Sequence, residues 1–493
     1  MTSGTKTNTL FKGMSIQTLV TMMMGVLEIT YFAIMSRLLT KADFGYFAAI
    51  SAVMAICMSL SDAGLGSAVI QKKDASEKHV STAFSLSCIM GGVFSILLFL
   101  LSPWIANLIA DETLAFPLQI MSSTIFMHSL ISVGNALLYR KLNFKRIGIN
   151  SVCSYFLSSC VGVILAYNGL GLMSIIYANI LYSVFTLVFL FGFCVRFPRW
   201  GIYKEERKGI VSFGGWLTIG VILNNISHQL DKLVLTKWLS VEALGAYNRP
   251  AGFVSTISTK INGIFDTVLF PMLADMQDNK EKVKSVFIRA VSLLNSFSVI
   301  LAITFFFNAE LIIDIFFGSE WLNIIPIMQI VSLSVIFNIN GRLVDCFFRS
   351  LNYVKLGTEL RFLGVLLTLG CLYIGARHGI IGVAWGLFIS NISLIIIKMI
   401  ALCLKIKSNM FEMFRCWLVA WKPAVIPTFA GVVYLYLPHS VFVNFVFAFI
   451  FAIIIFAEFV LYPKMISREY CLTVYPMIAK LVNKFKKDHN TKS

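Results

Sequence analysis

The sequence predicts an all-α polytopic membrane protein with about fourteen transmembrane helices. Of its 493 residues, 58% are hydrophobic and only 13% are charged, and the mean hydropathy is +0.82. Runs of about 20 apolar residues, the length that a helix needs to cross a bilayer core of about 30 Å, recur from one end of the chain to the other. An internal repeat, described below, then relates the first six helices to the next six.

Each predicted helix is an apolar run bounded by polar or charged residues. The first six are Met14–Met35, Phe44–Ser61, Val80–Leu101, Phe116–Leu138, Ile147–Ala166 and Leu172–Val195. The next six are Val211–Leu235, Pro250–Phe270, Val286–Phe307, Ile324–Phe348, Leu360–Ala376 and Gly382–Leu404, and the last two are Cys416–Leu437 and Val441–Tyr462. The first run is preceded by mostly polar residues and has no small-residue cleavage pattern, so we expect a retained helix and not a signal peptide.

Lysine and arginine are distributed unevenly over the loops of a chain whose formal net charge is +17. Most of them lie in the N-terminus, the even-numbered loops and the C-terminal tail. The odd-numbered loops hold only Arg37, Lys41, Lys237, Arg249 and Arg377. Because cytoplasmic loops are enriched in basic residues, we predict that both termini face the cytoplasm. Topology and contact with anionic headgroups explain the positive charge, and we expect no nucleic-acid partner.

Segments in the two halves of the chain match at a spacing of about 200 to 211 residues. Leu39–Phe47 matches Leu239–Tyr247 in register, and Leu142–Gly148 parallels Leu351–Gly357. Each copy covers six helices, and six is even, so the second copy enters the membrane in the same orientation as the first. This pattern predicts a parallel repeat about an axis along the membrane normal.

The repeat divides the chain into five predicted regions. These are a six-helix bundle over residues 1–196, a cytoplasmic connector over 197–210, a second six-helix bundle over 211–407, two further helices over 416–462 and a basic cytoplasmic tail over 463–493. Two such bundles enclose a cleft and give alternating access when one rocks against the other, which is typical of carriers. The outward loops are short, which argues against an enzyme that acts outside the membrane.

The sequence lacks the patterns that hold nucleotides or metals. It contains no P-loop, no glycine-rich dinucleotide turn and no nucleophile elbow. Its ten cysteines are scattered without a C-x-x-C pair, and there is no histidine cluster. We therefore expect no cofactor and no metal site. Uphill transport would then depend on an H⁺ or Na⁺ gradient, or on consumption of the product on the far side.

Charged and amide side chains inside the predicted helices are candidates for a binding cavity, because such groups are costly in lipid. The seventh helix carries Asn224, His228, Asp231 and Lys232, and the eighth carries Lys260, with Arg249 directly before its first residue. Arg249 and Lys260 are about three turns apart, so their side chains point nearly the same way. One hypothesis is a cationic wall for an anionic headgroup such as a pyrophosphate. The alternative is structural, with Asp231 paired to Lys232 or Lys260 and Arg249 at the membrane interface.

Glu28 is the only acid well inside the first helix, and Tyr31 lies on the same stripe. A buried carboxylate can carry a proton or help to hold Na⁺, which makes Glu28 a candidate coupling residue. The alternative is that Glu28 is the structural partner of a lysine or arginine on another helix.

Two other helices carry secondary cavity candidates. They are His128 and Asn135 on the fourth helix, and Asn338, Arg342 and Asp345 on the tenth. Arg342 and Asp345 are three residues apart, so an intrahelical ion pair is the default interpretation for them. A histidine such as His128 is more often a hydrogen-bonded residue of the bundle than a ligand.

Several segments taken together resemble bacterial polysaccharide transporters. Leu39–Phe47 followed by Asp62–Lys72 resembles the start of that family, and Ala136–Arg146 is similar to its connection between the fourth and fifth helices. Gln229–Pro250 and Phe270–Ala274 are also similar. The family comprises flippases for O-antigen, capsule and exopolysaccharide, within the superfamily that includes multidrug and toxic-compound extruders.

The resemblance implies a V-shaped, monomeric carrier in the bacterial inner membrane. Its substrates would be undecaprenyl-pyrophosphate-linked oligosaccharides, and its partners membrane lipids and the polymerase and glycosyltransferases of the pathway. The resemblance also implies a cationic central cavity, matched here by Lys260 and Arg249, with Lys232 as a weaker match. A basic residue inside the first or second helix would strengthen the match to the family. This sequence departs from that pattern, because Arg37 and Lys41 lie at the outer end of these helices.

Two other functions remain open at this stage. The first is a multidrug or cation antiporter of the same superfamily, which usually has twelve helices and an acidic cavity. The second is a polysaccharide polymerase or ligase, which would bring a long outward loop.

Overall fold

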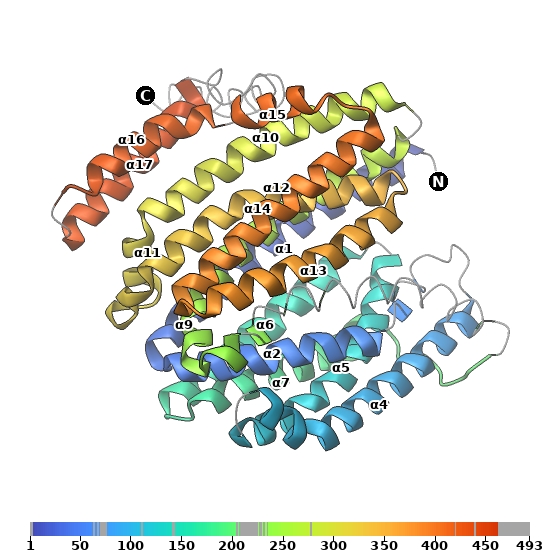
Figure 1. Ribbon diagram of the computed structural model, residues 1–493. Helices are drawn as coiled ribbons and strands as arrows, with labels where there is room; N and C mark the ends of the chain where they lie inside the picture. Colours follow the sequence, from blue (N-terminus) through green and yellow to red (C-terminus); the bar gives the residue numbers. More distant parts are fainter. Residues whose placement is uncertain are drawn as a thin grey trace, which may run out of the picture. The chain divides into compact units, whose positions relative to one another are not determined.

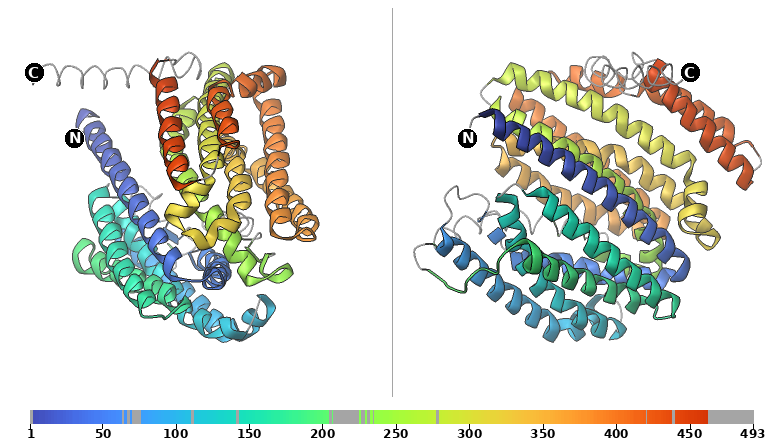
Figure 2. Two further views of the ribbon diagram at one scale, coloured as in Figure 1. Left: turned by 90° about the vertical axis from the view of Figure 1, so that its left-hand side faces the viewer. Right: turned by 180° about the vertical axis from the view of Figure 1, so that it is seen from behind.

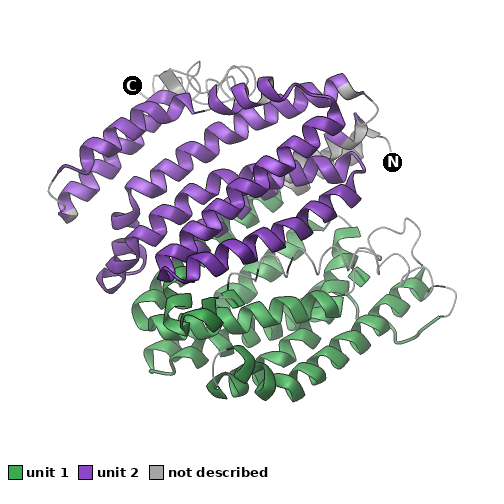
Figure 3. Ribbon diagram, in the orientation of Figure 1, with its two compact units in different colours: residues 1–249 green, residues 250–493 purple. Residues whose placement is uncertain are grey.

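The computed structural model is helical throughout and has no strand in the residues that it describes, which confirms the predicted all-α class (Figure 1). These residues are 3–62, 65–66, 69, 76–109, 112–140, 143–203, 206, 225, 229, 232–233, 235–276, 279–419, 421–437 and 440–461. Among them, eleven helices are long and apolar enough to cross a membrane. The chain forms two compact units, residues 1–249 and 250–493 (Figure 3).

Unit 1 consists of helices that pack along one another in pairs. They are α1 (Ser3–Leu38), α2 (Lys41–Asp62), α4 (Glu77–Ile109), α5 (Ala115–Arg140), α6 (Phe144–Tyr167), α7 (Leu172–Phe189) and the start of α9 (Val241–Asp275), with the short turns η1 (Glu112–Leu114) and η2 (Leu190–Cys194). The most extensive contact is that of α4 with α5. Small residues allow it, since a Cβ on Gly91 would lie 2.7 Å from Cβ of Ser129.

Unit 2 contains the rest of α9 and the helices that follow it (Figure 2). They are α10 (Lys280–Phe307), α11 (Ala309–Phe316), α12 (Ile325–Ser350), α13 (Val354–Ala376), α14 (Gly379–Ile406), α15 (Met410–Val419), α16 (Val425–Tyr434) and α17 (Val441–Leu461), with the turns η3 (Ser319–Ile324) and η4 (Lys422–Ala424). Helix α10 packs on α12, and α13 packs on α14. At that second contact Gly375 and Gly382 face each other, and a Cβ on either would collide with a backbone oxygen of the other.

In the described residues, ten of the fourteen predicted transmembrane helices correspond to long apolar helices, and the eleventh candidate span, Trp417–Tyr434, corresponds to the predicted Cys416–Leu437. Val211–Leu235 lies outside the described residues except for a few positions. Pro250–Phe270 forms part of α9, which begins earlier, at Val241, and Val441–Tyr462 corresponds to α17. The predicted Cys416–Leu437 is not one continuous helix but α15, η4 and α16 in succession. Pro423 and Pro427 explain the break, because proline lacks the N–H that a continuous helix needs.

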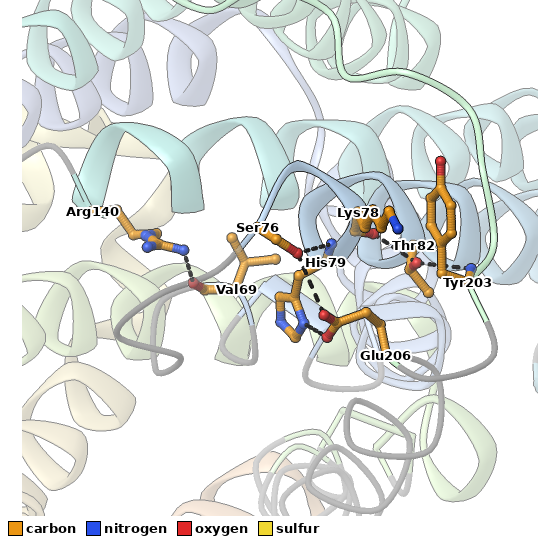
Figure 4. A network of polar contacts seen from close by, with 8 residues as sticks. All are labelled: Val69, Ser76, Lys78, His79, Thr82, Arg140, Tyr203 and Glu206. Atoms are coloured by element: carbon orange, nitrogen blue, oxygen red, sulfur yellow. Dashed lines mark hydrogen bonds and ion pairs between the residues drawn. The ribbon is translucent and has the colours of Figure 1, made fainter.

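The segment after α7 lies along the first turns of α4 (Figure 4). Ser76, directly before α4, and His79, Thr82 and Ser85 of α4 lie at intervals of three residues. The backbone N–H of Gly201 donates to Ser85 Oγ (2.9 Å) and that of Tyr203 to Thr82 Oγ1 (3.1 Å). His79 Nδ1 lies 2.7 Å from the Glu206 carboxylate, and Ser76 Oγ donates a hydrogen bond to the same carboxylate at 3.4 Å. This part of the predicted connector is therefore fastened to unit 1.

Helices α2 and α9 cross in unit 1 at two glycines of the sequence repeat. A Cβ on Gly45 would collide with the carbonyl oxygen of Val241, and a Cβ on Gly245 would collide with that of Lys41. The two contacts are equivalent in the repeat, because Gly245 and Val241 lie 200 residues after Gly45 and Lys41. This is the register in which the two segments match in sequence. The symmetry of the crossing supports the inferred repeat.

We predict that Gly45→Ala or Gly245→Ala destabilises the protein by about 1–3 kcal/mol, because the added methyl meets a backbone atom and not a movable side chain. The measurement is the midpoint of thermal unfolding in detergent. Gly252→Ala on α9 is the control, since a Cβ there has nothing within 4 Å. It should be neutral, or stabilise by up to about 1 kcal/mol. Equal effects at all three positions would contradict the tight crossing.

Candidate functional site

Arg249 is a buried guanidinium held between aromatic rings. It lies on α9 one turn after Gly245 and is 6% exposed. Its Cζ lies 4.0 Å from the ring centroid of Phe32 on α1 and directly over the ring of Phe44 on α2. Aromatic faces attract a cation, and the attraction is strongest when water is excluded.

No anion offsets this charge among the described residues. Nε and Nη2 of Arg249 have no hydrogen-bond partner, and none of the described ion pairs includes this residue. Burying an ion costs several kcal/mol unless a partner of opposite charge compensates. Unit 1 therefore contains a desolvated cation whose Nε and Nη2 have no acceptor among the described residues, which is the electrostatic requirement for binding an anion.

A row of tyrosines begins beside Arg249. Tyr31 of α1 interacts electrostatically with Arg249, and its hydroxyl is buried without a hydrogen-bond partner. The rings of Tyr31 and Tyr155 on α6 pack edge to face with their centroids 6.1 Å apart. Tyr155 packs in the same way on Tyr182 of α7, with a centroid distance of 6.0 Å. The row thus joins α1, α6 and α7.

Glu28 lies on α1 about one turn before Tyr31 and is partly buried. It interacts electrostatically with Tyr155 and Tyr182. The structure therefore connects the predicted coupling acid to Arg249 through tyrosine side chains of a single unit. Tyr155 and Tyr182 were not among the sequence candidates, because tyrosine is common in transmembrane helices and only the packing of α6 on α7 brings these two together.

The other candidates from the predicted cationic wall are only partly described. Asn224, His228 and Asp231 lie outside the described residues. Lys232 is described and partly buried. Lys260 lies on α9 in unit 2 and is also partly buried.

His128 and Asn135 lie on α5. The His128 side chain is exposed and interacts electrostatically with Asp62 at the end of α2. Asp62 also accepts a hydrogen bond from Ser132 Oγ (2.6 Å), and Asn135 is partly buried. The structure thus places His128 in a polar cluster with Asp62 and Ser132, which joins α2 to α5.

Asp345 is paired, but not with the residue that the sequence suggested. Its carboxylate lies 2.9 Å from Lys398 Nζ on α14 and 3.8 Å from Arg361 on α13, while Arg342 and Asn338 are exposed on α12. The expected intrahelical pair with Arg342 is therefore wrong. Lys398 is 6% exposed and needs a counter-ion, whereas an exposed arginine is solvated by water. Arg361 and Lys398 could have been recognised from the sequence as candidates for ion pairing, because each is a basic residue inside a predicted transmembrane helix.

We predict that Asp345→Asn destabilises unit 2 by about 3–5 kcal/mol, because it leaves the buried Lys398 ammonium without its carboxylate. Arg342→Gln, on the exposed side of the same helix, should change stability by less than about 0.5 kcal/mol. Thermal unfolding in detergent measures both. Replacing the pair together, as Asp345→Leu with Lys398→Met, should recover most of the loss. If the single variant is as stable as the unaltered protein, the ion pair is not structural.

These features define a class of protein: a polytopic helical membrane protein of the transporter type, with a buried cation in one unit. Comparison with known sequences gives the family. The family model described as "Polysaccharide biosynthesis protein" matches residues 34–326, and the chain belongs to this family.

Two curated bacterial relatives match most of the chain. The lipopolysaccharide biosynthesis protein WzxC of Escherichia coli (strain K12) is 25% identical over 388 residues, which cover 77% of each protein. The teichuronic acid biosynthesis protein TuaB of Bacillus subtilis (strain 168) is 24% identical over 433 residues, which cover 84% of this chain and 86% of TuaB. The chain is thus a multi-pass bacterial membrane protein.

Solved structures share the fold at low sequence identity. The lipid II flippase MurJ in an inward closed conformation superposes with a TM-score of 0.71 at 14% identity, over 90% of this chain and 98% of MurJ. An inward-facing multidrug transporter of the MATE family gives a TM-score of 0.66 at 14% identity, over 80% of this chain and 98% of the transporter. Both comparisons confirm the all-helical transporter fold.

Proposed function

We propose that the chain is a flippase for undecaprenyl-pyrophosphate-linked oligosaccharides. It would move them from the cytoplasmic to the outer leaflet of the bacterial inner membrane, for synthesis of O-antigen, capsule or exopolysaccharide. The buried Arg249 carries the proposal, because it has no anionic partner among the residues that the structure describes and a pyrophosphate would supply acceptors for its guanidinium. The family and the names of both relatives, which are surface-polysaccharide biosynthesis proteins, support it.

In this proposal the substrate is bound by its phosphates and not by its sugars. The paired N–H groups of the planar Arg249 guanidinium donate hydrogen bonds to phosphate oxygens, and Lys260 stays a second candidate for binding the anionic headgroup. The glycosyltransferases of the pathway would supply the lipid-linked sugar at the cytoplasmic face, and a polymerase would consume it at the outer face. A carrier of this kind makes and breaks no covalent bond, so it is not an enzyme.

Transport is coupled in this proposal to an H⁺ or Na⁺ gradient through Glu28. The electrostatic interaction of Glu28 with Tyr155 and Tyr182, and of Tyr31 with Arg249, supports a link between the ion and substrate sites. The charge distribution over the loops supports an orientation with both termini in the cytoplasm. We take the carrier to act as a monomer.

We expect Arg249→Gln to reduce flipping of fluorescent undecaprenyl-pyrophosphate oligosaccharide in proteoliposomes by about 10–100-fold. This is the effect of losing a charged hydrogen bond worth roughly 1.5–3 kcal/mol. Arg377→Gln, which removes the same charge from an exposed loop position, is the matched control and should leave the rate unchanged.

The same vesicles test the alternative function. The fold shared with the MATE transporter favours a multidrug antiporter as the second candidate. If the unaltered protein moves no lipid-linked sugar but extrudes cationic dyes, the flippase proposal is wrong and the antiporter takes its place.

Glu28→Gln should abolish stimulation of flipping by a pH or Na⁺ gradient while transport without a gradient persists, because the amide can neither carry a proton nor neutralise Na⁺. Glu112→Gln, at an exposed acid in η1, is the control and should keep the stimulation. Flipping rates are compared with each gradient imposed separately, which identifies the ion. If Glu28→Gln responds to the gradients as the unaltered protein does, coupling lies elsewhere.

A further inference from the structure

Arg249, Phe32 and Phe44 together form an arrangement that the proposed function does not by itself require. The guanidinium is buried and lies against ring faces, and no acidic side chain in the described part of the chain pairs with it. We propose that Phe32 and Phe44 form an aromatic clamp that holds Arg249 while the headgroup site is empty, and that a phosphate-bearing headgroup must draw the guanidinium off the rings. This inference rests on the proposed function.

The backbone crossing explains why the clamp forms. Phe44 immediately precedes Gly45, and Arg249 follows Gly245 by one turn, so both side chains leave their helices next to the contact of the two glycines. Because neither glycine has a Cβ, the helices approach closely enough for the guanidinium to cover the Phe44 ring. Phe32 closes the arrangement from α1. The clamp therefore depends on three helices of one unit.

Arg249 is held less strongly by the aromatic rings than it would be by a pyrophosphate. Ring faces attract the positive charge, but they leave Nε and Nη2 without acceptors. A pyrophosphate offers both the opposite charge and the missing acceptors, so it competes successfully for the same group. A neutral lipid alcohol offers neither and leaves Arg249 on the rings. Phe32 and Phe44 are thus positioning residues, because they hold the guanidinium that gives the site its selectivity for anionic headgroups.

The clamp makes a specific prediction, because rings that stabilise the empty site oppose binding. Removing a ring face by Phe32→Leu should tighten binding of geranyl pyrophosphate to the purified full-length protein about tenfold, equivalent to about 1.4 kcal/mol. Binding is measured by calorimetry in detergent, with geraniol as the neutral probe. Phe32→Tyr keeps the ring face and should bind as the unaltered protein does. A residue with a merely structural role would instead weaken binding when truncated.

A double-mutant cycle tests whether the effect passes through Arg249. In an Arg249→Gln background, Phe32→Leu should change the affinity by less than twofold, because there is no guanidinium left to release. Phe44→Leu provides a second, independent removal of a ring face if Phe32→Leu does not fold. Unchanged or weaker binding in a folded leucine variant with Arg249 present would overturn the clamp.

The outcomes separate this inference from the proposed function. If the unaltered protein binds geranyl pyrophosphate and geraniol equally, or binds neither, the anion site fails and the clamp with it. If Arg249→Gln abolishes binding but the leucine variants bind as the unaltered protein does, the anion site stands and only the clamp is wrong.

Discussion

The close approach of the α2 and α9 backbones in unit 1 is the contact on which the candidate site depends. Helices in a membrane gain little from burying apolar surface against each other, so association depends on how closely their backbones can pack. Gly45 and Gly245 permit a contact in which each glycine faces a carbonyl of the other helix. This contact sets the distance between Phe44 and Arg249 and so determines that the guanidinium rests on a ring.

The two units accommodate buried charge in opposite ways. In unit 2, the carboxylate of Asp345 neutralises Lys398, and Arg361 lies nearby. Lys398 therefore has a permanent counter-ion and a structural role. In the described part of unit 1, Arg249 lies against aromatic faces and interacts with Tyr31, and two of its nitrogens have no acceptor. A carrier of an anionic lipid needs a cation that is neither satisfied permanently nor so exposed that water screens it. Arg249 meets both conditions, whereas Lys398 does not.

The fold class and most of the helices could be predicted because a transmembrane helix is a continuous run of apolar residues, which can be recognised in the sequence alone. Such a prediction fails where one local feature outweighs the apolar run, as in Cys416–Leu437, which Pro423 and Pro427 divide. Charge pairing was less predictable. Arg342 and Asp345 are neighbours on one helix, yet Lys398, more than 50 residues away in the sequence, takes the carboxylate because it is buried and Arg342 is not.

By itself, the sequence determined that this is a helical membrane protein, it indicated an internal repeat, and it identified Arg249 and Glu28 as candidates. Length, apolar composition and the scarcity of charge within helices are local properties, and the bilayer acts on each helix separately. Only the tertiary structure decided that Arg249 lies between Phe32 and Phe44, and that Tyr155 and Tyr182 connect α6 and α7 to Glu28. Those contacts join residues far apart in the chain, and they depend on how closely particular helices cross, which no single helix encodes.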